Sequence, residues 1–358
     1  MWKSLKDRAE GVKEMKRMKT TEAVGQVLCH DITQIIPGVT KDAVFRKGHI
    51  IREEDIPVLL SVGKDSVYIW ENDETMMHEN DAAEVLYRMT ANEHMHPSDV
   101  KEGKIEAIAD TEGLLKVDRE KLKKVNAFGE MMIATRHGNT VVKKGDKLAG
   151  TRIIPLVIKK DKMQEAEKIC DGTPILKILP FTVKKAAIIT TGNEVYHGRI
   201  KDAFTPVIEQ KIAEFGAEMM FHEIFDDNDR KITDGCLRAI EAGADIVFCT
   251  GGMSVDPDDK TPLAIKNTDA RIVSYGSPVL PGAMFLLSYY RKGDKVIPIC
   301  GLPGCAMYNR RTIFDLVLPR LMAADPVTAD ELASLGEGGL CLNCKVCTFP
   351  NCGFGKGW

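Results

Sequence analysis

The sequence predicts an α/β protein. Its C-terminal half should be a doubly wound, mostly parallel sheet, preceded by a mixed α+β N-terminal region and followed by a short cysteine-rich tail. From about residue 181 onward, short apolar strands alternate with helical segments that end at glycines. This alternation is typical of parallel strands joined by helices on both faces of a sheet. Before residue 181 the apolar runs are shorter and less regular, which favours a mixed α+β region.

The elements of the C-terminal half follow from apolar runs of strand length and from glycines that end helices. The expected strands are residues 186–191, 217–224, 245–250, 271–274, 285–290 and 296–300. The expected helices are residues 206–215, 232–242, a segment from Thr261 with Pro262 in its first turn, and 305–322. Proline is tolerated there because the first helical N–H groups have no partner in the helix.

The N-terminal region carries weaker signals. Residues 1–19 are expected to be a frayed amphipathic helix or disordered, and residues 20–180 one mixed α+β region. Within that region we expect strands at 65–70 and 113–117, and helices at 56–62, 81–93, 119–126 and 159–172. Gly63 is a plausible stop for the first helix and Asp118 an N-cap for the third. Residues 136–160 should be β-rich, residues 181–325 form the α/β domain, and residues 326–358 form a glycine linker and the tail.

Composition excludes several classes of function. The chain has 358 residues, a net charge of -3 and 28% charged residues, so no overall basic field points to nucleic acid. No apolar run approaches membrane-spanning length, and the basic N-terminus lacks the apolar segment of a signal peptide. Six of the ten cysteines are scattered through apolar or turn contexts, as expected of buried thiols in a reduced compartment. We therefore expect a cytoplasmic protein.

The most informative stretch is residues 245–262, DIVFCTGGMSVDPDDKTP. A buried strand is followed by Gly251 and Gly252, which let backbone amides approach a ligand closely. Met253 and Ser254 come next, and then three carboxylates, Asp256, Asp258 and Asp259. Acids beside an anion site are reasonable if a hard cation such as Mg2+ lies between them and the anion. The alternative is an ordinary turn with solvated acids.

Two more loops share this composition. Thr191, Gly192 and Glu194 follow the strand at 186–191. Leu302, Pro303 and Gly304 follow the strand at 296–300, where the glycines could present amides at the start of the last helix. All three loops should lie at the carboxyl ends of strands, where such sheets bind ligands. None matches the dinucleotide or P-loop pattern, so an anion pocket of another kind is expected.

These motifs resemble those of a known family. The stretches ITTGNEV, TGGMSVDPDDKTP, LPGAM and GLPGCAM occur in the order found in the molybdopterin-binding domain. This domain is shared by molybdopterin molybdenumtransferases, molybdopterin adenylyltransferases and competence-damage-inducible proteins. The earlier stretches TEAVGQVLCHDI, KGHIIREEDIPVLLSVGKDSVYIW and VVKKGDKLAG are similar to the N-terminal region of the molybdenumtransferases.

The resemblance implies a pocket for molybdopterin or for molybdopterin-AMP, its adenylylated form. Gly251, Gly252 and Ser254 would hold the phosphate end, and the loop from Leu302 to Gly304 would form a second wall. Glu194 and Asp259, with Asp258 as a close alternative, match positions of acids near Mg2+ and molybdate. They would serve cleavage of the adenylyl phosphoanhydride during molybdenum insertion. A homodimer is also implied, as is a molybdopterin adenylyltransferase or molybdoenzyme partner.

Several departures from the molybdenumtransferase pattern favour binding over turnover. The family's Ser-Ala-Met-Asp-Gly stretch does not occur in residues 1–358, and we expect its C-terminal β domain to be lacking. Leu280 and Ala283 flank Pro281-Gly282 where the family has lysines, which removes two cations from an oxyanion site. Cys305 replaces the asparagine that follows the family's Leu-Pro-Gly.

The last eighteen residues contain Cys341, Cys344, Cys347 and Cys352 in a C-x2-C-x2-C-x4-C pattern. Four thiolates on so short a segment could bind a [4Fe-4S] cluster or Zn2+; the alternative is a disordered tail with free thiols. Three functions are compatible with the whole sequence. They are an Mg2+-dependent molybdenumtransferase that releases AMP, a non-catalytic molybdopterin carrier or sensor with a redox or docking tail, and a nucleotide pyrophosphatase of the competence-damage-inducible type.

Overall fold

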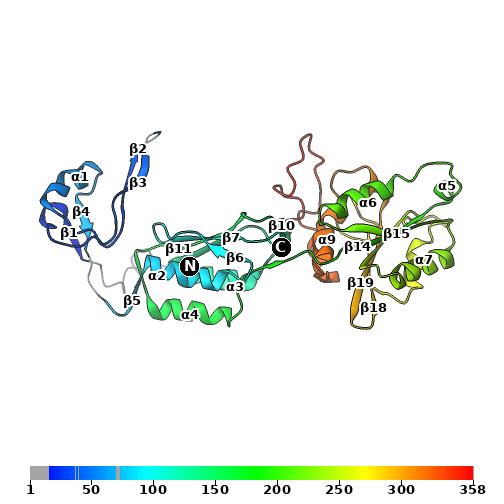
Figure 1. Cartoon of the computed structure of the whole chain (residues 1–358), viewed down its shortest axis with the longest axis horizontal. Coiled ribbons are helices and arrows are strands. Elements are labelled where there is room, and N and C mark those ends of the chain that lie inside the picture. The colour runs from blue at the N-terminus through cyan, green and yellow to red at the C-terminus, as the bar shows by residue number, and fades with distance from the viewer. Residues whose placement is uncertain (1–15, 37, 39, 70–72, 358) are drawn as a thin grey trace, which may run out of the picture.

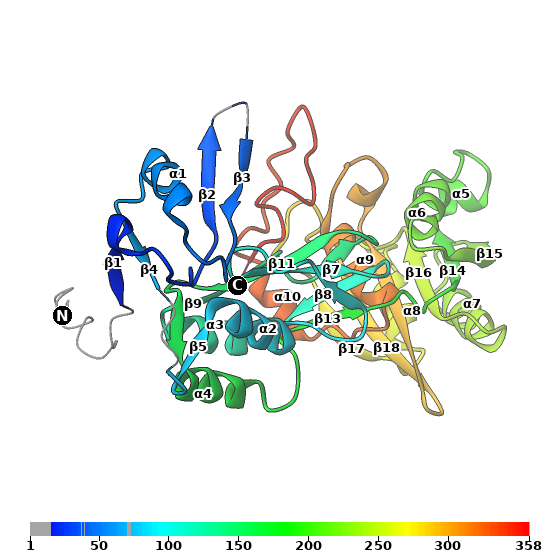
Figure 2. The ribbon, with the colours of Figure 1, turned by 60° about the vertical axis from the view of Figure 1, so that its left-hand side comes forward.

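The computed structural model describes residues 16–357 except residues 37, 39 and 70–72. Three units follow one another along the long axis of the molecule (Figure 1). We call residues 17–69 the N-terminal unit, 76–179 the middle unit and 185–322 the C-terminal unit. Residues 323–357, the tail, return to the boundary between the middle and C-terminal units (Figure 2). In the described part of the chain no helix is long and apolar enough to cross a membrane.

The N-terminal unit consists of short strands and turns around a small apolar core that includes Leu28, Ile51 and Leu59. Its elements are β1 (Arg17–Lys19), β2 (Ile32–Ile36), β3 (Thr40–Phe45), α1 (Ile56–Ser61), β4 (Ser66–Tyr68) and the 3-10 helices η2 (Thr20–Glu22) and η3 (Glu53–Asp55). Helix α1 ends before Gly63 as predicted, and Gly63 has a φ of 77°.

The prediction that residues 1–19 form a frayed helix or are disordered is wrong for residues 17–19. Residues 17–19 form strand β1, which pairs antiparallel with β4. Met18 packs against the core of the unit, so burial and the sheet pairing outweigh the local helical pattern. Residues 1–15 lie outside the described residues.

The middle unit is built from three small antiparallel sheets and three helices that share one core. Its strands are β5 (Met76–His78), β6 (Met95–Pro97), β7 (Lys104–Ala109), β8 (Gly113–Val117), β9 (Met131–Thr135), β10 (Thr140–Val142), β11 (Lys147–Ile153), β12 (Val157–Lys159) and β13 (Leu176–Leu179). Its helices are α2 (Glu79–Thr90), α3 (Arg119–Ala127) and α4 (Lys160–Cys170). The side chain of Asp118 accepts a hydrogen bond from the backbone N–H of Lys121, so the predicted N-cap of α3 is confirmed.

Residues 20–180 therefore contain two hydrophobic cores that have no residue in common. The N-terminal and middle units contact each other through polar groups. The hydroxyl of Thr33 donates to Glu102 at 2.6 Å, and the ring Nε2 of His78 lies 2.7 Å from the carbonyl oxygen of Cys29. We therefore propose that residues 20–180, which the sequence predicts to be one region, form two units that are divided near residue 75.

The C-terminal unit confirms the predicted α/β class. Its six-stranded sheet has the order β15-β14-β16-β19-β18-β17, and β14 pairs in parallel with β15 and β16, as β16 does with β19. Strands β17 and β18 add antiparallel pairs at one edge. The strands are β14 (Lys185–Thr191), β15 (Glu218–Phe225), β16 (Ile246–Thr250), β17 (Arg271–Tyr275), β18 (Leu286–Lys292) and β19 (Lys295–Leu302).

Helices cover both faces of this sheet because side chains alternate along each strand. On β14, Ala186 and Ile188 face the core under α6 and α9, whereas Ala187 and Ile189 face the core under α7 and α8. The helices are α5 (Asn193–Tyr196), α6 (Phe204–Ala213), α7 (Asp229–Glu241), α8 (Thr261–Lys266), the 3-10 helix η4 (Gly304–Met307) and α9 (Ile313–Met322).

The last helix does not begin where the sequence predicts. Residues 304–307 form only a 3-10 turn, and α9 starts at Ile313. A capping box fixes this start, because the side chain of Thr312 accepts from the backbone of Phe314 and Asp315 accepts from the backbone N–H of Thr312. The Leu302–Gly304 loop is therefore not the N-terminus of the long helix.

The tail is packed against the C-terminal unit. After α10 (Ala329–Ser334) the backbone N–H and carbonyl of Leu280 bond to Gly339 and Cys341, and the buried ring of Phe354 joins the core under α9. A side chain on Gly339 would lie 2.5–2.6 Å from backbone oxygens. The predicted glycine linker is therefore wrong: the glycines permit close packing instead of free motion.

Candidate functional site

The carboxyl ends of three neighbouring parallel strands bring the three predicted loops together. Thr190 at the end of β14 is in register with Thr250 at the end of β16, and Thr250 is in register with Leu302 at the end of β19. The chain order reverses here, because β15 lies on one side of β14 and β16 on the other. This is the position at which open α/β sheets bind ligands.

Gly251 and Gly252 allow β16 and β14 to approach each other at this edge. Both have positive φ values, 81° and 52°, which glycine adopts without steric cost. A Cβ on Gly251 would lie 2.1 Å from the carbonyl oxygen of Thr191, and one on Gly252 would lie 2.9 Å from the hydroxyl of Thr261. The backbone of the glycine pair therefore fits a gap that no side chain can enter.

Two threonine hydroxyls hold the loops in place. The hydroxyl of Thr261 donates to the carbonyl of Gly251 at 2.8 Å and lies 3.1 Å from the hydroxyl of Thr191. Next to them, the buried hydroxyl of Thr250 has no hydrogen-bond partner among the described residues. Sequence reasoning named Thr191 and missed Thr261, although its place at the start of α8 was predicted.

Four carboxylates surround this edge, and one of them was not predicted. Burial raises the pKa of Asp227, and so do the nearby negative charges of Glu194, Asp258 and Asp259, while a hydrogen bond from the N–H of Asn193 at 3.1 Å acts against them. Asp227 follows β15, the strand beside β14. Its signal in the sequence is the run Asp-Asp-Asn directly after a strand, which shares the acids of the recognised loops but contains no glycine.

Two of the predicted acids are also engaged locally. The side chain of Glu194 folds over Gly192, where an added Cβ would lie 2.9 Å from the glutamate Oε1. Asp259 accepts a hydrogen bond from the backbone N–H of Asp256 at 2.9 Å. Asp258 is exposed, so it is free to turn toward a ligand.

Several predicted contact residues have side chains that point into the core. Met253 is only 4% exposed and packs under Gly301, where a Cβ would lie 2.5 Å from the methionine sulfur. Leu302 is fully buried, and Pro303 is buried as well. These residues offer only their backbone, and the carbonyl of Met253 already accepts from the hydroxyl of Tyr275 at 3.1 Å. Ser254 and Gly304 are exposed at the edge.

A polar network supports the β14 loop from the side of α6. The hydroxyls of Thr190 and Thr205 both donate to Asp202, at 3.0 and 2.5 Å. Burial alone would raise the pKa of Asp202, but these hydrogen bonds and those from the backbone N–H groups of Phe204 and Thr205 together lower it. Asp202 therefore stays ionised and fixes the end of β14.

The structure does not assemble the predicted metal ligands. Within the described ranges, no three His, Cys, Asp or Glu side chains lie close enough to hold a metal ion. Cys341 and Cys352 are half-buried against the core, whereas Cys344 and Cys347 are exposed on the loop between them. The predicted metal sites are therefore not preformed, and they remain predictions.

Two stretches of the chain match known protein families. Residues 187–323 match a family described as "probable molybdopterin binding domain". Residues 17–71 match a domain of unknown function, DUF8806.

Curated relatives match only part of the chain. A competence-damage inducible protein of Bacillus velezensis is 32% identical over 88 residues, which are 25% of this chain and 21% of the relative. A protein of the same name from Bacillus cereus is 32% identical over 129 residues, which are 36% of this chain and 30% of the relative. The chain thus spans about a fifth to a third of the length of these relatives.

Solved structures with similar folds are more distant in sequence. The tungsten cofactor synthesizing protein MoaB from Pyrococcus furiosus is 20% identical, with a TM-score of 0.32 over 39% of this chain and 89% of that chain. A molybdenum cofactor biosynthesis protein from the same organism is 13% identical, with a TM-score of 0.24 over 88% of this chain and 66% of that chain. Residues 187–323 are thus similar to the family that is described as a probable molybdopterin binding domain.

Proposed function

We propose that the C-terminal unit binds molybdopterin or molybdopterin-AMP at the carboxyl edge of β14, β16 and β19. The observation that carries this proposal is the meeting of Gly251 and Gly252 with Thr191 and Thr261 at the point where the strand order reverses. Exposed backbone amides in such a turn bind phosphate oxygens. The match of residues 187–323 to a molybdopterin-binding family supports the choice of a pterin as ligand.

The acids at this edge would then require a cation. Glu194, Asp227, Asp258 and Asp259 repel one another and would also repel a phosphate. Carboxylate oxygens suit Mg2+, which would relieve both repulsions when bound and would polarise the phosphate. In the described residues these side chains do not yet converge, so binding of the ion would require them to turn inward.

Two activities are compatible with this site. One is Mg2+-dependent insertion of molybdenum with release of AMP, and the other is non-catalytic carriage or sensing of the pterin. The absence of lysines beside Pro281-Gly282 favours carriage. Leu280, which stands at one of those positions, is bonded through its backbone to the tail, so an approaching oxyanion would meet no cation there. Residues of a partner copy would have to replace the missing charges in an active homodimer.

The test is to incubate the full chain with molybdopterin-AMP, Mg2+ and molybdate while measuring both pterin binding and AMP release. Insertion predicts AMP release that Glu194→Gln and Asp259→Asn abolish. Carriage predicts tight binding without release, weakened by Gly252→Val. The exposed Asp234 on α7 offers a matched control, because Asp234→Asn removes a carboxylate outside the site. Absence of pterin binding to the wild-type chain refutes both activities.

A second candidate is hydrolysis of a nucleotide pyrophosphate bond. It is favoured by the sequence similarity to competence-damage inducible proteins and by the run of acids after Gly252. The same incubation with ADP-ribose in place of the pterin distinguishes it. Release of AMP from ADP-ribose, without binding of molybdopterin, would replace the first proposal with this one.

We further propose that the tail cysteines bind a [4Fe-4S] cluster or Zn2+ after the exposed loop of Cys344 and Cys347 folds toward Cys341 and Cys352. The density of cysteines supports this, because exposed thiols oxidise readily unless they are coordinated. Anaerobic purification with metal analysis and an absorption spectrum decides between iron and zinc. A chain without bound metal that retains four titratable thiols in the tail would refute the proposal.

A further inference from the structure

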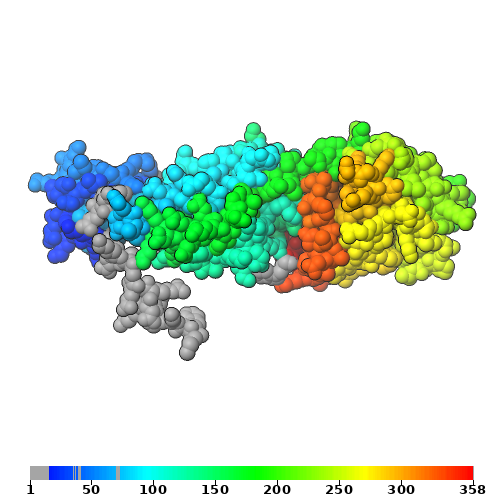
Figure 3. All heavy atoms as spheres, turned by 90° about the horizontal axis from the view of Figure 1, so that it is seen from below, coloured from blue at the N-terminus to red at the C-terminus, as the bar shows by residue number. Residues whose placement is uncertain are grey.

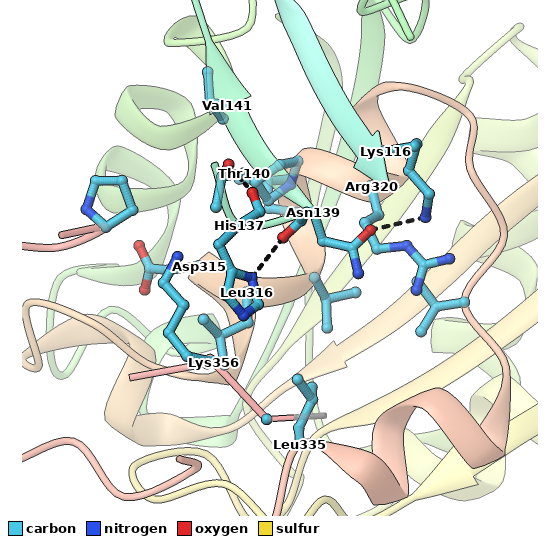
Figure 4. Close-up of a pocket in the computed structure, with 18 of the residues that line it drawn as sticks. Lys116, His137, Asn139, Thr140, Val141, Asp315, Leu316, Arg320, Leu335 and Lys356 are labelled. Atoms are coloured by element: carbon cyan, nitrogen blue, oxygen red, sulfur yellow. Dashed lines mark hydrogen bonds between the residues drawn. The ribbon is translucent and has the colours of Figure 1, made fainter. Parts of the chain in front are cut away.

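A cavity of about 790 Å3 lies between the middle unit, helix α9 and the end of the tail (Figure 4). Its volume falls within the range of small-molecule sites, about 300–1,000 Å3. It has no lining residue in common with the edge of the C-terminal sheet. Figure 3 shows the orange-red segment that includes α9 standing at the boundary between the middle and C-terminal units.

One wall of the cavity is apolar. Leu316 on α9 and Val141 on β10 are half-buried and pack against the core of the C-terminal unit. Phe354 from the tail is only 5% exposed and lies in the same core. The three side chains come from three distant parts of the sequence, so this surface exists only once the units and the tail have assembled.

The two charged residues of α9 that line the cavity, Asp315 and Arg320, already have ion-pair partners. Asp315 is bound by Arg311 at 2.8 Å and by Lys211. Arg320 forms ion pairs with Asp325 and with Glu331. The other lining acids are exposed to solvent: Glu112, Asp118, Glu120 and Glu214.

Two other cations that line the cavity, Lys356 and Arg119, have no ion-pair partner among the described residues. Within the described part of the chain, the half-buried Lys356 forms no ion pair, and the exposed Arg119 donates only to the backbone carbonyl of Gly357, at 3.2 Å. His137 lies beside them (Figure 4). Burial lowers the pKa of His137, and the positive charges of Lys356 and Arg119 lower it further, while hydrogen bonds to the backbone of Gly138 and Lys356 act against this shift. Both cations are therefore close enough to act on the same imidazole ring.

Burying a cation without a counter-ion is costly. A ligand anion would remove this cost for Lys356, and an apolar ring would cover the surface of Leu316 and Val141. We propose that the cavity is a second ligand site, which binds a small aromatic anion of nucleoside-monophosphate size with its anionic group at Lys356 and Arg119. The tail contributes Lys356 and Phe354, so the four-cysteine segment also builds a binding site in the same chain.

The experiment is isothermal titration of the full chain with AMP as the probe, compared with adenosine and inorganic phosphate. We expect AMP to bind, adenosine to bind more weakly, and Lys356→Gln and Arg119→Gln each to weaken AMP binding about tenfold through loss of a charged hydrogen bond. Lys345→Gln is the matched control, because Lys345 is an exposed tail lysine that does not line the cavity.

A second set of variants separates this cavity from the edge of the C-terminal sheet, where AMP would also bind if the proposed function is correct. Gly252→Val blocks that edge and should leave binding in the cavity intact. AMP binding that is lost in Gly252→Val and unchanged in both Lys356→Gln and Arg119→Gln would overturn the inference. So would equal affinity for adenosine and AMP, or no binding of AMP to the wild-type chain below about 1 mM. Because the two cation variants lie on different units, misfolding of one does not remove the test.

Discussion

Gly251 gives the sharpest test of how the sheet-edge site is built. In Gly251→Ala the new methyl group would lie 2.1 Å from the carbonyl oxygen of Thr191, and the residue would have to keep a φ of 81°. A left-handed conformation costs about 1–2 kcal/mol for a residue with a side chain. Forcing a methyl group against backbone costs about 1–3 kcal/mol more, because β14 and β16 must separate. The expected loss of stability is therefore about 2–5 kcal/mol.

A matched variant separates the two contributions. Gly198, in the loop after α5, has a φ of 67° and open space around its Cα. Gly198→Ala should therefore cost only the conformational strain, about 1–2 kcal/mol. The difference between the stability losses of the two variants measures the cost of the contact between the new methyl group and the backbone of Thr191.

The assay is native-state hydrogen exchange followed by mass spectrometry, because it reports local opening free energies in a chain with several units. In Gly251→Ala, the opening free energy of peptides that cover β14 and β16 should fall by the expected amount, so these peptides exchange faster. The exchange rates of peptides of the middle unit should not change. Equal losses in Gly251→Ala and Gly198→Ala would show that the contact with Thr191 contributes nothing, and the structural argument for the site would fail.

Three further predictions concern charge and thiol groups elsewhere in the chain. Asp315→Asn leaves two cations around a neutral side chain that is 4% exposed. Calorimetry should therefore show that the free energy of unfolding falls by about 3–5 kcal/mol, whereas Asp330→Asn, on the exposed surface of α10, should leave it almost unchanged. Iodoacetamide should label the exposed Cys344 in the folded chain. Cys300 is fully buried, and burial raises its pKa, so it should be labelled only after unfolding. Labelling of Cys300 before Cys344 would refute this. The folded-state pKa of Asp202 lies below its ordinary value, so its contribution to stability is present at neutral pH and is lost as the pH falls through the folded value. Asp202→Asn should flatten the acid limb of stability against pH below about pH 4, and an unchanged acid limb would contradict the network at β14.

The C-terminal sheet was predictable because its signals are local. Each strand is a short apolar run, and α6 and α7 end close to Gly216 and Gly243, so alternation alone gives the class. The edge where Gly192 and Gly251 meet also follows, since the carboxyl ends of parallel strands share one side of a sheet. Asp227 was not predicted because its loop contains no glycine, and acids alone are typical of any solvated turn.

The start of α9 was missed for a different reason. The stretch 305–312 has no proline or glycine to interrupt a helix, and the local signal for the boundary is the capping-box pattern Thr312-x-x-Asp315. Asp315 is held there by Lys211, a residue distant in sequence. Such pairing depends on the assembled fold and leaves no trace in the local pattern.

The composition of the tail indicates a metal site, and its packing against α9 suggests the separate ligand site that we propose. Cys341 and Cys352 lie at the two ends of a loop whose flanking segments are fixed, the first by Leu280 and the second by Phe354. A metal ion would therefore have to be bound by movement of the loop that carries Cys344 and Cys347, while the flanking segments stay in place. Because Phe354 and Lys356 belong to the fixed part, the cavity should keep its shape whether or not the cysteines hold a metal. The two sites then share a segment of chain without competing for the same conformation.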